Sequence, residues 1–256
     1  MVQAELLRLV GVSRAFRGGG RVRLPVLANA SLSVAPGEIV AVVGSRDEGK
    51  TTLLEIAAGI QPPDCGEVWF GDLELTKLTD GARAELLGRD IRWVRREGTG
   101  VRFDVLDYVG LPLVIGRGHG YREAEKLALD ALDRVGAADC ADRAWGHLSN
   151  WERVQVSFAR GIVGSPRLLL VDDVMDGLGM SRTRHAGELL CSLARDSGFG
   201  VLMSVTDLEA ALIADRVLCF ERGGLRVMSD QTRHDAEVIE FPDGARQARG
   251  ARTARS

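Results

Sequence analysis

One segment of this chain restricts its fold more than any other. Residues Gly44–Thr51 read Gly-Ser-Arg-Asp-Glu-Gly-Lys-Thr, which is the spacing G-x-x-x-x-G-K-T. The run Glu38–Val43 before it is apolar and β-branched, which predicts a buried strand, and Thr52–Ala58 after it has helical spacing. A strand, a glycine-rich loop and a helix in this order are typical of the loop that cradles the phosphates of a nucleotide.

This loop supplies the groups that phosphates require. Gly44 and Gly49 allow backbone N–H groups to turn toward phosphate oxygens, and the start of the helix adds positive potential. Lys50 would place a charge at the β and γ phosphates, and the Thr51 hydroxyl would bind Mg²⁺. Only three of the 33 basic residues are lysines, which argues against a chance lysine here. We therefore expect a nucleotide triphosphate with Mg²⁺ to be held by Gly44, Ser45, Arg46, Asp47, Glu48, Gly49, Lys50, Thr51 and Thr52.

A second marker is the run Leu168–Asp173, an apolar strand that ends in two carboxylates. A carboxylate at the tip of a buried strand beside a phosphate loop can hold Mg²⁺ through its water shell, which suits Asp172. The next residue, Asp173, could orient a water molecule for attack. The alternative is an ordinary solvated strand end.

Composition limits the class of protein. With 45% hydrophobic residues in 256, the chain can bury a sizeable core, and its net charge of −3 argues against a general nucleic-acid binder. No apolar run approaches the roughly 20 residues of a membrane span, and the first residues lack a secretory pattern, so we expect a cytoplasmic chain. The scattered cysteines predict reduced thiols and no zinc site: Cys65, Cys140, Cys191 and Cys219.

Short apolar runs and helical stretches alternate along the chain, as expected of an α/β protein with a parallel sheet. Between the runs, Tyr121–Arg134 repeats leucine and alanine at three- and four-residue steps, which predicts a helix that packs on one face. Residues 244–256 carry an arginine at every third position, which predicts a disordered tail, either solvated or attracted to anionic lipid or nucleic acid. The runs that predict strands are 6–10, 30–34, 39–43, 68–70, 168–171, 200–204 and 216–220, and the section between 70 and 168 is helical rather than strand-like.

Further stretches follow the pattern of one family: Pro36–Glu38, Gly59–Gly66, Asp104–Leu113, Leu148–Ser149, Val156–Arg160, Asp176–Leu178 and Ala214–Val217. With them the chain resembles the ATP-binding subunits of ABC transporters from Leu6 to Met228, and most of all those that pair with lipoprotein-releasing and macrolide-export permeases. The resemblance implies an α/β fold of the P-loop NTPase class, with a RecA-like core and a mixed sheet. It also implies a nucleotide-binding domain over residues 1–243, with a helical subdomain inserted at about 88–162.

The resemblance assigns positions around the nucleotide as well. An aromatic ring stacks on adenine at the position of Phe16, although a Phe packed in a strand layer would look the same. Leu106–Val114 falls where family members dock on the permease, and it keeps an apolar pattern that a plain core helix would also have. The family's catalytic glutamate and switch histidine correspond to Asp173 and Thr206. This Asp carboxylate is one methylene shorter than that of Glu, and threonine cannot act as an imidazole.

Two other departures concern communication within the site. The family's Mg²⁺-sensing glutamine corresponds to Arg96, give or take one residue. A fixed cation cannot ligate Mg²⁺, so Arg96 either pairs with the γ-phosphate or belongs to a solvated charge cluster. The aspartate that couples the two sites of the family is Gly179 here, which puts that coupling in doubt.

The family signature is altered where two glycines normally follow Leu-Ser, in the stretch Leu148, Ser149, Asn150, Trp151 and Glu152. Ser149 and Glu152 form an S-x-x-E capping pattern, so we expect the helix to start there as usual. Asn150 and Trp151 replace the glycines. The Trp151 indole either prevents close approach of this backbone to phosphate or anchors a permanent protein contact.

ATP sites of this family are shared across a dimer, so a partner subunit could repair only half of each site. We expect an ATP-binding subunit at the inner face of the cell membrane, docked on a permease, as a homodimer or with a second ATP-binding subunit. ATP and Mg²⁺ would bind, and hydrolysis would be weak or asymmetric. One alternative is a pseudo-ATPase scaffold with nucleotide as a structural ligand. A nucleic-acid-associated ATPase is supported only by the arginine tail.

Overall fold

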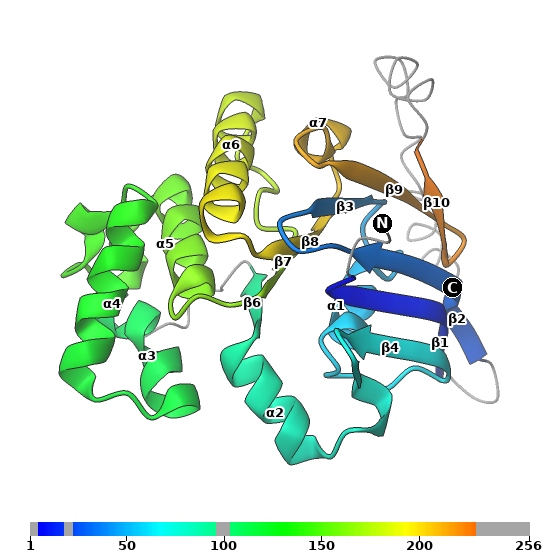
Figure 1. Ribbon diagram of the computed structural model, residues 1–256. Helices are drawn as coiled ribbons and strands as arrows, with labels where there is room; N and C mark the ends of the chain where they lie inside the picture. Colours follow the sequence, from blue (N-terminus) through cyan, green and yellow to red (C-terminus); the bar gives the residue numbers. More distant parts are fainter. Residues whose placement is uncertain (1–4, 18–22, 96–102, 229–256) are drawn as a thin grey trace, which may run out of the picture.

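The computed structural model describes residues 5–17, 23–95 and 103–228, which form two sheets and a set of helices (Figure 1). The strands are β1 (Leu7–Arg17), β2 (Arg23–Val34), β3 (Ile39–Val43), β4 (Cys65–Phe70), β5 (Leu73–Glu74), β6 (Ile91–Arg95), β7 (Leu168–Asp172), β8 (Gly200–Val205), β9 (Arg216–Glu221) and β10 (Gly224–Val227). The α-helices are α1 (Lys50–Ala57), α2 (Asp80–Arg89), α3 (Val105–Arg117), α4 (Tyr121–Arg134), α5 (Asn150–Ile162), α6 (Met180–Ser197) and α7 (Leu208–Ala211). Within the described ranges, none of these helices has the length and apolar character that crossing a membrane requires.

The larger sheet has the strand order β10-β9-β3-β8-β7-β6. Its strands pair in parallel from β9 to β6, and β10 joins β9 in antiparallel fashion. All five residues of β3 are buried, because the strand has a neighbour on each edge and a covered face on each side. The mixed sheet confirms the fold class expected from the sequence.

The smaller sheet is antiparallel, with the order β2-β1-β4-β5. β1 and β2 are longer than the runs 6–10 and 30–34 predict. The parts of the two strands outside these runs lack a clear alternation of apolar and polar residues, because the pairing between the strands shifts register at several points beyond Leu9. The two-residue β5 and the half-exposed β10 also escaped prediction, since such short strands carry no periodic pattern.

Two hydrophobic cores lie on opposite faces of the six-stranded sheet. Alternate residues of β3 belong to each: Ala41 packs with α3 to α6, and Val42 packs with α1 and the smaller sheet. Figure 1 shows the same division, with α3, α4 and α5 grouped at one end of the molecule and β1, β2 and β4 at the other. The phosphate loop and the stretch Leu148–Glu152 therefore belong to different layers.

The helical group follows β6 in the chain. α4 begins and ends where its periodicity predicts, and it is buried along one face only, at Ala124, Ala128, Ala131 and Leu132. The range 88–162 contains α3, α4 and α5, but it also contains β6, which pairs with β7 as an edge strand of the large sheet. The tail 244–256 lies outside the described residues, as does Arg96.

Candidate functional site

The phosphate loop joins the buried strand β3 to α1, in the order that the motif predicts. Gly49 precedes the helix with φ of 110°, and a Cβ there would overlap Val26 of β2, so the position requires glycine. No side chain among the described residues caps α1. The first N–H groups of the helix therefore have no side-chain acceptor and are placed to face an anion.

Lys50 is the buried cation of this loop. Its side chain is 3% exposed, and Nζ lies 3.6 Å from Asp173 Oδ2. Nζ also donates hydrogen bonds of 2.8 Å to the carbonyl oxygens of Gly44 and Ser45. Two of its three donors are thus bound to loop carbonyl groups, and its charge faces the Asp173 carboxylate.

The tip of the loop carries three charged side chains in succession. Glu48 Oε2 accepts a 2.7 Å hydrogen bond from the N–H of Ser45, within the loop itself. Arg46 instead reaches out of the loop, and its Nη2 lies 2.5 Å from Asp176 Oδ2. Asp47 between them adopts a left-handed conformation with φ of 63°. The loop is thus tied to the segment that follows β7.

A network of oxygen atoms joins the end of β7 to the start of α1. Thr51 Oγ1 donates to Asp172 Oδ1 over 3.2 Å, and the Ser204 hydroxyl of β8 donates to the same oxygen at 2.8 Å. Thr52 follows in the first turn of α1. Sequence reasoning missed Ser204, which is 1% exposed. Its only signal was one hydroxyl in an otherwise apolar strand.

The Thr51 hydroxyl and the Asp172 carboxylate are hard oxygen donors, which suit Mg²⁺. Among the described residues, no cluster of three His, Cys, Asp or Glu could hold a metal. A Mg²⁺ ion at Thr51 and Asp172 would therefore need further ligands from phosphate oxygens and water. The residues present fit the ion that a bound nucleoside triphosphate brings with it.

Asp173 stands in a constrained position directly after β7. Its φ is 46°, its N–H donates to Ser204 Oγ at 3.1 Å, and its buried Oδ1 has no hydrogen-bond partner among the described residues. Burial raises the pKa of Asp173; Lys50 opposes this shift, and the Asp172 carboxylate adds to it. Its other oxygen, Oδ2, is the one that lies near Lys50.

Asp173 and Thr206 line one small cavity of about 80 Å³, together with Asp176, Gly179 and Asp207. The cavity lies between the end of β8 and the segment that leads into α6. The structure thus brings together the two positions at which the resemblance places catalysis. Thr206 contributes a hydroxyl to this cavity, and no histidine lines it.

The stretch Leu148–Glu152 leads into α5 with the capping box that the sequence predicts. The N–H of Ser149 donates to Glu152 Oε2 at 2.6 Å, and the N–H of Glu152 donates back to Ser149 Oγ at 3.3 Å. Arg143 Nη1 lies 2.5 Å from Glu152 Oε1. These bonds, led by those to Ser149, lower the pKa of Glu152 to about 2. Leu148 anchors this turn, because its side chain is buried.

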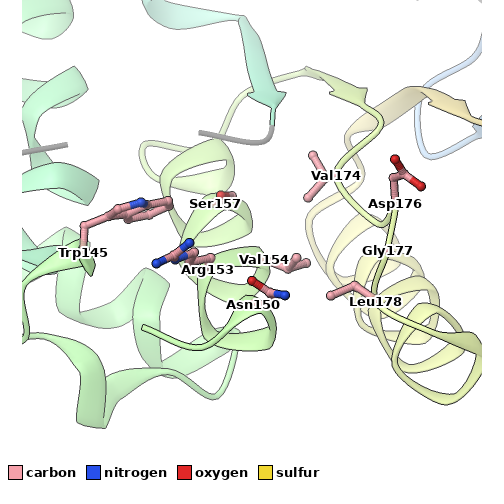
Figure 2. Close-up of a pocket in the computed structure, with 9 residues that line it drawn as sticks. All are labelled: Trp145, Asn150, Arg153, Val154, Ser157, Val174, Asp176, Gly177 and Leu178. Atoms are coloured by element: carbon pink, nitrogen blue, oxygen red, sulfur yellow. The ribbon is translucent and has the colours of Figure 1, made fainter. Parts of the chain in front are cut away.

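Figure 2 shows the start of α5 across a narrow cleft from the segment that follows β7. Asn150 faces Leu178 in this cleft, whose volume is about 30 Å³. Trp151 packs edge to face against His185 of α6, with ring centroids 5.1 Å apart. α5 and α1 belong to the two separate cores, so the signature and the phosphate loop of one chain do not form a single site.

Phe16 lies near the end of β1 and is 36% exposed. The Arg14 guanidinium lies 5.3 Å from the centre of its ring. Phe16 pairs with Leu24 of β2, two residues from the Val26 that packs against Gly49. The ring is therefore accessible on the β2 side of the phosphate loop, where a base could stack.

A buried lysine in a glycine-rich loop, between a central parallel strand and a helix of an α/β fold, defines a P-loop NTPase. A family model described as "ABC transporter" matches residues 27–176. The chain belongs to this family, as an ATP-binding subunit.

Curated relatives match nearly the whole chain. The lipoprotein-releasing system ATP-binding protein LolD of Cereibacter sphaeroides is 34% identical over 221 residues, which cover 86% of this chain and 98% of the relative. LolD of Koribacter versatilis is 33% identical over 213 residues, which cover 83% of this chain and 95% of the relative.

Solved structures share the fold. The dimeric bacterial ABC transporter cassette MJ0796 superposes with a TM-score of 0.79 at 24% identity, over 87% of this chain and 98% of that one. The protein cbiO1 of Clostridium perfringens also gives 0.79, at 20% identity, over 92% of each chain.

Proposed function

We propose that this subunit binds ATP with Mg²⁺ at residues 44–52, docks on a membrane permease at the cytoplasmic face, and hydrolyses ATP slowly or at only one of two sites. The observation that carries the proposal is a contrast within the site. The groups that hold phosphate and Mg²⁺ are intact, at Lys50, Thr51 and Asp172. The groups beside the attacking water are altered, because Asp173 lies against Lys50 and Thr206 has no imidazole.

Each side chain has a defined part in this scheme. Lys50 binds the β and γ phosphates, while Thr51 and Asp172 hold Mg²⁺, which neutralises charge on the phosphates. Ser204 orients Asp172 through its hydroxyl. The Asp173 carboxylate reaches about 1.5 Å less far than that of a glutamate. A misplacement of this size can cost ~100-fold in rate.

A dimer supplies the missing half of each site. The start of α5 packs on the other face of the sheet from α1, so it can meet a phosphate loop only in another subunit. The solved relative MJ0796 is described as dimeric, which supports this arrangement. In a homodimer, Asn150 and Trp151 of one copy would face the nucleotide of the other. If the partner were a second ATP-binding subunit with the usual family residues, each of the two sites would combine one altered half from this chain with one unaltered half from the partner.

The permease would dock on a groove between α3 and α4. A cavity of about 360 Å³ opens there, and its apolar lining includes Phe103, Leu106, Leu111, Val114 and Tyr121. Phe103 is 49% exposed and Tyr121 is 78% exposed, so two aromatic rings are accessible to a partner. The LolD relatives belong by name to a lipoprotein-releasing system, which favours a permease of the lipoprotein-releasing or macrolide-export type. We also assign the helical part of residues 88–162 to this docking role.

Nucleotide binding and turnover test the proposal separately. Calorimetry should show Mg²⁺-dependent ATP binding that is lost in Lys50→Ala, and phosphate release should be slow. Restoring the family residues together, as Asn150→Gly, Trp151→Gly, Asp173→Glu and Thr206→His, should then raise hydrolysis by a homodimer. A flat rate despite tight binding would show that these four positions are not the block.

A pseudo-ATPase scaffold is the second candidate, favoured by the constrained Asp173 and the missing imidazole. Tight nucleotide binding alone stabilises a fold by several kcal/mol. In that case the complete complex would release no phosphate, and transport would be unchanged by Lys50→Ala. Salt-dependent binding to nucleic acid is not expected, and any that disappeared on deletion of residues 244–256 would belong to the tail.

A further inference from the structure

Two ion pairs connect the phosphate loop to the segment that follows β7. Lys50 Nζ lies 3.6 Å from Asp173 Oδ2, and Arg46 Nη2 lies 2.5 Å from Asp176 Oδ2. Arg46 and Lys50 are the two basic residues of Gly44–Thr51. Both cations of the loop are thus paired with carboxylates that stand three residues apart in one segment.

The position of Arg46 places its charge at the far end of a bound triphosphate. Lys50 reaches the β and γ phosphates in loops of this kind, and its partner here is Asp173. Asp176, the partner of Arg46, lines the same small cavity as Asp173. The guanidinium therefore lies on the side of the loop where the terminal phosphate would be, and not on the side of Phe16.

In the ion pair between Arg46 and Asp176, a phosphate oxygen can replace the Asp176 carboxylate as the partner of Arg46. The Arg46 side chain is 74% exposed, and ion pairs of such exposed side chains contribute little to stability. A phosphate carries more charge than a carboxylate, and it accepts two parallel hydrogen bonds from a guanidinium. Displacement of Asp176 by a phosphate oxygen therefore costs little and gains a stronger partner.

We propose that Arg46 exchanges Asp176 for the terminal phosphate, and that this exchange makes the site prefer a nucleoside triphosphate over a diphosphate. The inference rests on the proposed function, since it takes the loop to be the nucleotide site. It adds a side-chain contact to those of the backbone and Lys50. Asp176 acts as an internal competitor that occupies Arg46 until a third phosphate is present.

The exchange also links the nucleotide to the cleft beside α5. Asp176 belongs to the segment that forms one wall of this cleft, opposite Asn150 and Val154. Figure 2 shows the Asp176 carboxylate pointing away from α5, while Leu178 of the same segment points toward it. Release of Arg46 therefore removes one contact of a segment that borders both the phosphate loop and the start of α5.

A double-mutant cycle on the full chain tests the exchange. The variants are Arg46→Ala, Asp176→Asn and their combination, with Glu188→Gln as a matched loss of one negative charge on the exposed part of α6. The measurement is the Kd for a non-hydrolysable ATP analogue and for ADP, each with Mg²⁺, by calorimetry. Thermal unfolding without nucleotide verifies that every variant is folded.

We expect Asp176→Asn to tighten binding of the triphosphate by about 3- to 10-fold, the range of one exposed ion pair or slightly more. Its effect on ADP should stay within about twofold. Arg46→Ala should weaken binding of the triphosphate about 10-fold and leave ADP nearly unchanged, because a charge-assisted bond to the terminal phosphate is lost. In the Arg46→Ala background, the effect of Asp176→Asn should shrink to about twofold or less, the part that comes from the repulsion between the Asp176 and Asp173 carboxylates.

The exchange would be overturned by an Asp176→Asn variant with unchanged affinity, by equal effects on both nucleotides, or by an Asp176→Asn effect of undiminished size without Arg46. An equal gain in Glu188→Gln would attribute the change to net charge and would also overturn it. If the wild-type chain bound neither nucleotide, the proposed function would fail as well. Binding without coupling would leave the proposed function intact.

Discussion

Arg92 of β6 is a basic residue in a buried position. It is 8% exposed, yet its Nε and Nη2 have no hydrogen-bond partner among the described residues. Burial lowers its pKa to about 10, and the positive charges of Arg117 and Arg160 add to this shift. A buried charge without a counter-ion destabilises the folded state, because the unfolded chain leaves it in water.

We expect Arg92→Met to raise the free energy of unfolding by roughly 1–4 kcal/mol at pH 7. A base whose folded pKa is lowered costs stability wherever it is protonated. The penalty is therefore full below about pH 10 and is relieved as the pH rises above the lowered pKa toward the ordinary, higher pKa of an arginine. Urea unfolding measures the change, with the exposed Arg95→Met of the same strand as the control, expected within about 0.5 kcal/mol. A less stable Arg92→Met would contradict this account.

The residues that sequence could assign are those whose chemistry follows from motif spacing. Lys50, Thr51 and Asp172 needed only the loop pattern and the strand that ends in carboxylates. Ser204 could not be singled out, because nothing local indicates that its hydroxyl points at Asp172. The pair of Arg46 with Asp176 is equally hidden, since its members lie 130 residues apart in the chain.

At the scale of elements, the start of α5 depends on the capping box of Ser149 and Glu152. We expect Ser149→Ala to cost about 1 kcal/mol of stability, because one N–H at the helix start loses its acceptor. Glu152→Gln keeps a capping oxygen and should retain most of the helix start.

Two variants, Glu152→Gln and Glu152→Ala, should separate the contribution of the capping oxygen to stability from that of the negative charge on Glu152. An acid whose folded pKa is lowered to about 2 adds stability above its ordinary pKa of 4.5 and loses it as the pH falls from 4.5 to 2. Urea midpoints of the wild type should fall over this range more steeply than those of Glu152→Gln or Glu152→Ala. At neutral pH, Glu152→Ala should be the less stable of the two. Parallel pH profiles for all three proteins would rule out a charged cap.

Helices and strands in which apolar residues repeat at regular steps could be predicted from the sequence, and those without such a repeat could not. The sequence predicts α4 at its observed bounds, because small and large apolar residues repeat along one face. β6 carries no such period, because Arg92 interrupts its apolar residues. β5 and β10 consist of two and four residues, too few to show alternation, and tertiary pairing alone makes them strands.

At the scale of the whole molecule, the helical group presents its groove on an end of the fold away from the smaller sheet. A partner that enters this groove contacts α3 and α4, and α5 packs against both helices. α5 begins at the altered signature and borders the cleft with Asp176. If the permease docks on this groove as proposed, it and the nucleotide would contact elements that touch each other, which would give a direct route for coupling.

We expect Phe103→Asp to abolish co-purification with the membrane permease proposed as the partner, because a carboxylate would be buried against an apolar surface. Phe103 is 49% exposed, so the isolated subunit should keep its unfolding midpoint and its affinity for ATP. Leu129→Asp on α4 is the matched control: Leu129 is 41% exposed and is not among the residues that line the groove, so it should leave co-purification unchanged. Equal loss in both variants would mean that the contact is spread over the helical group. Retention of the permease by Phe103→Asp would show that docking occurs on another face, and the route from groove to α5 to Asp176 would then lack its first contact.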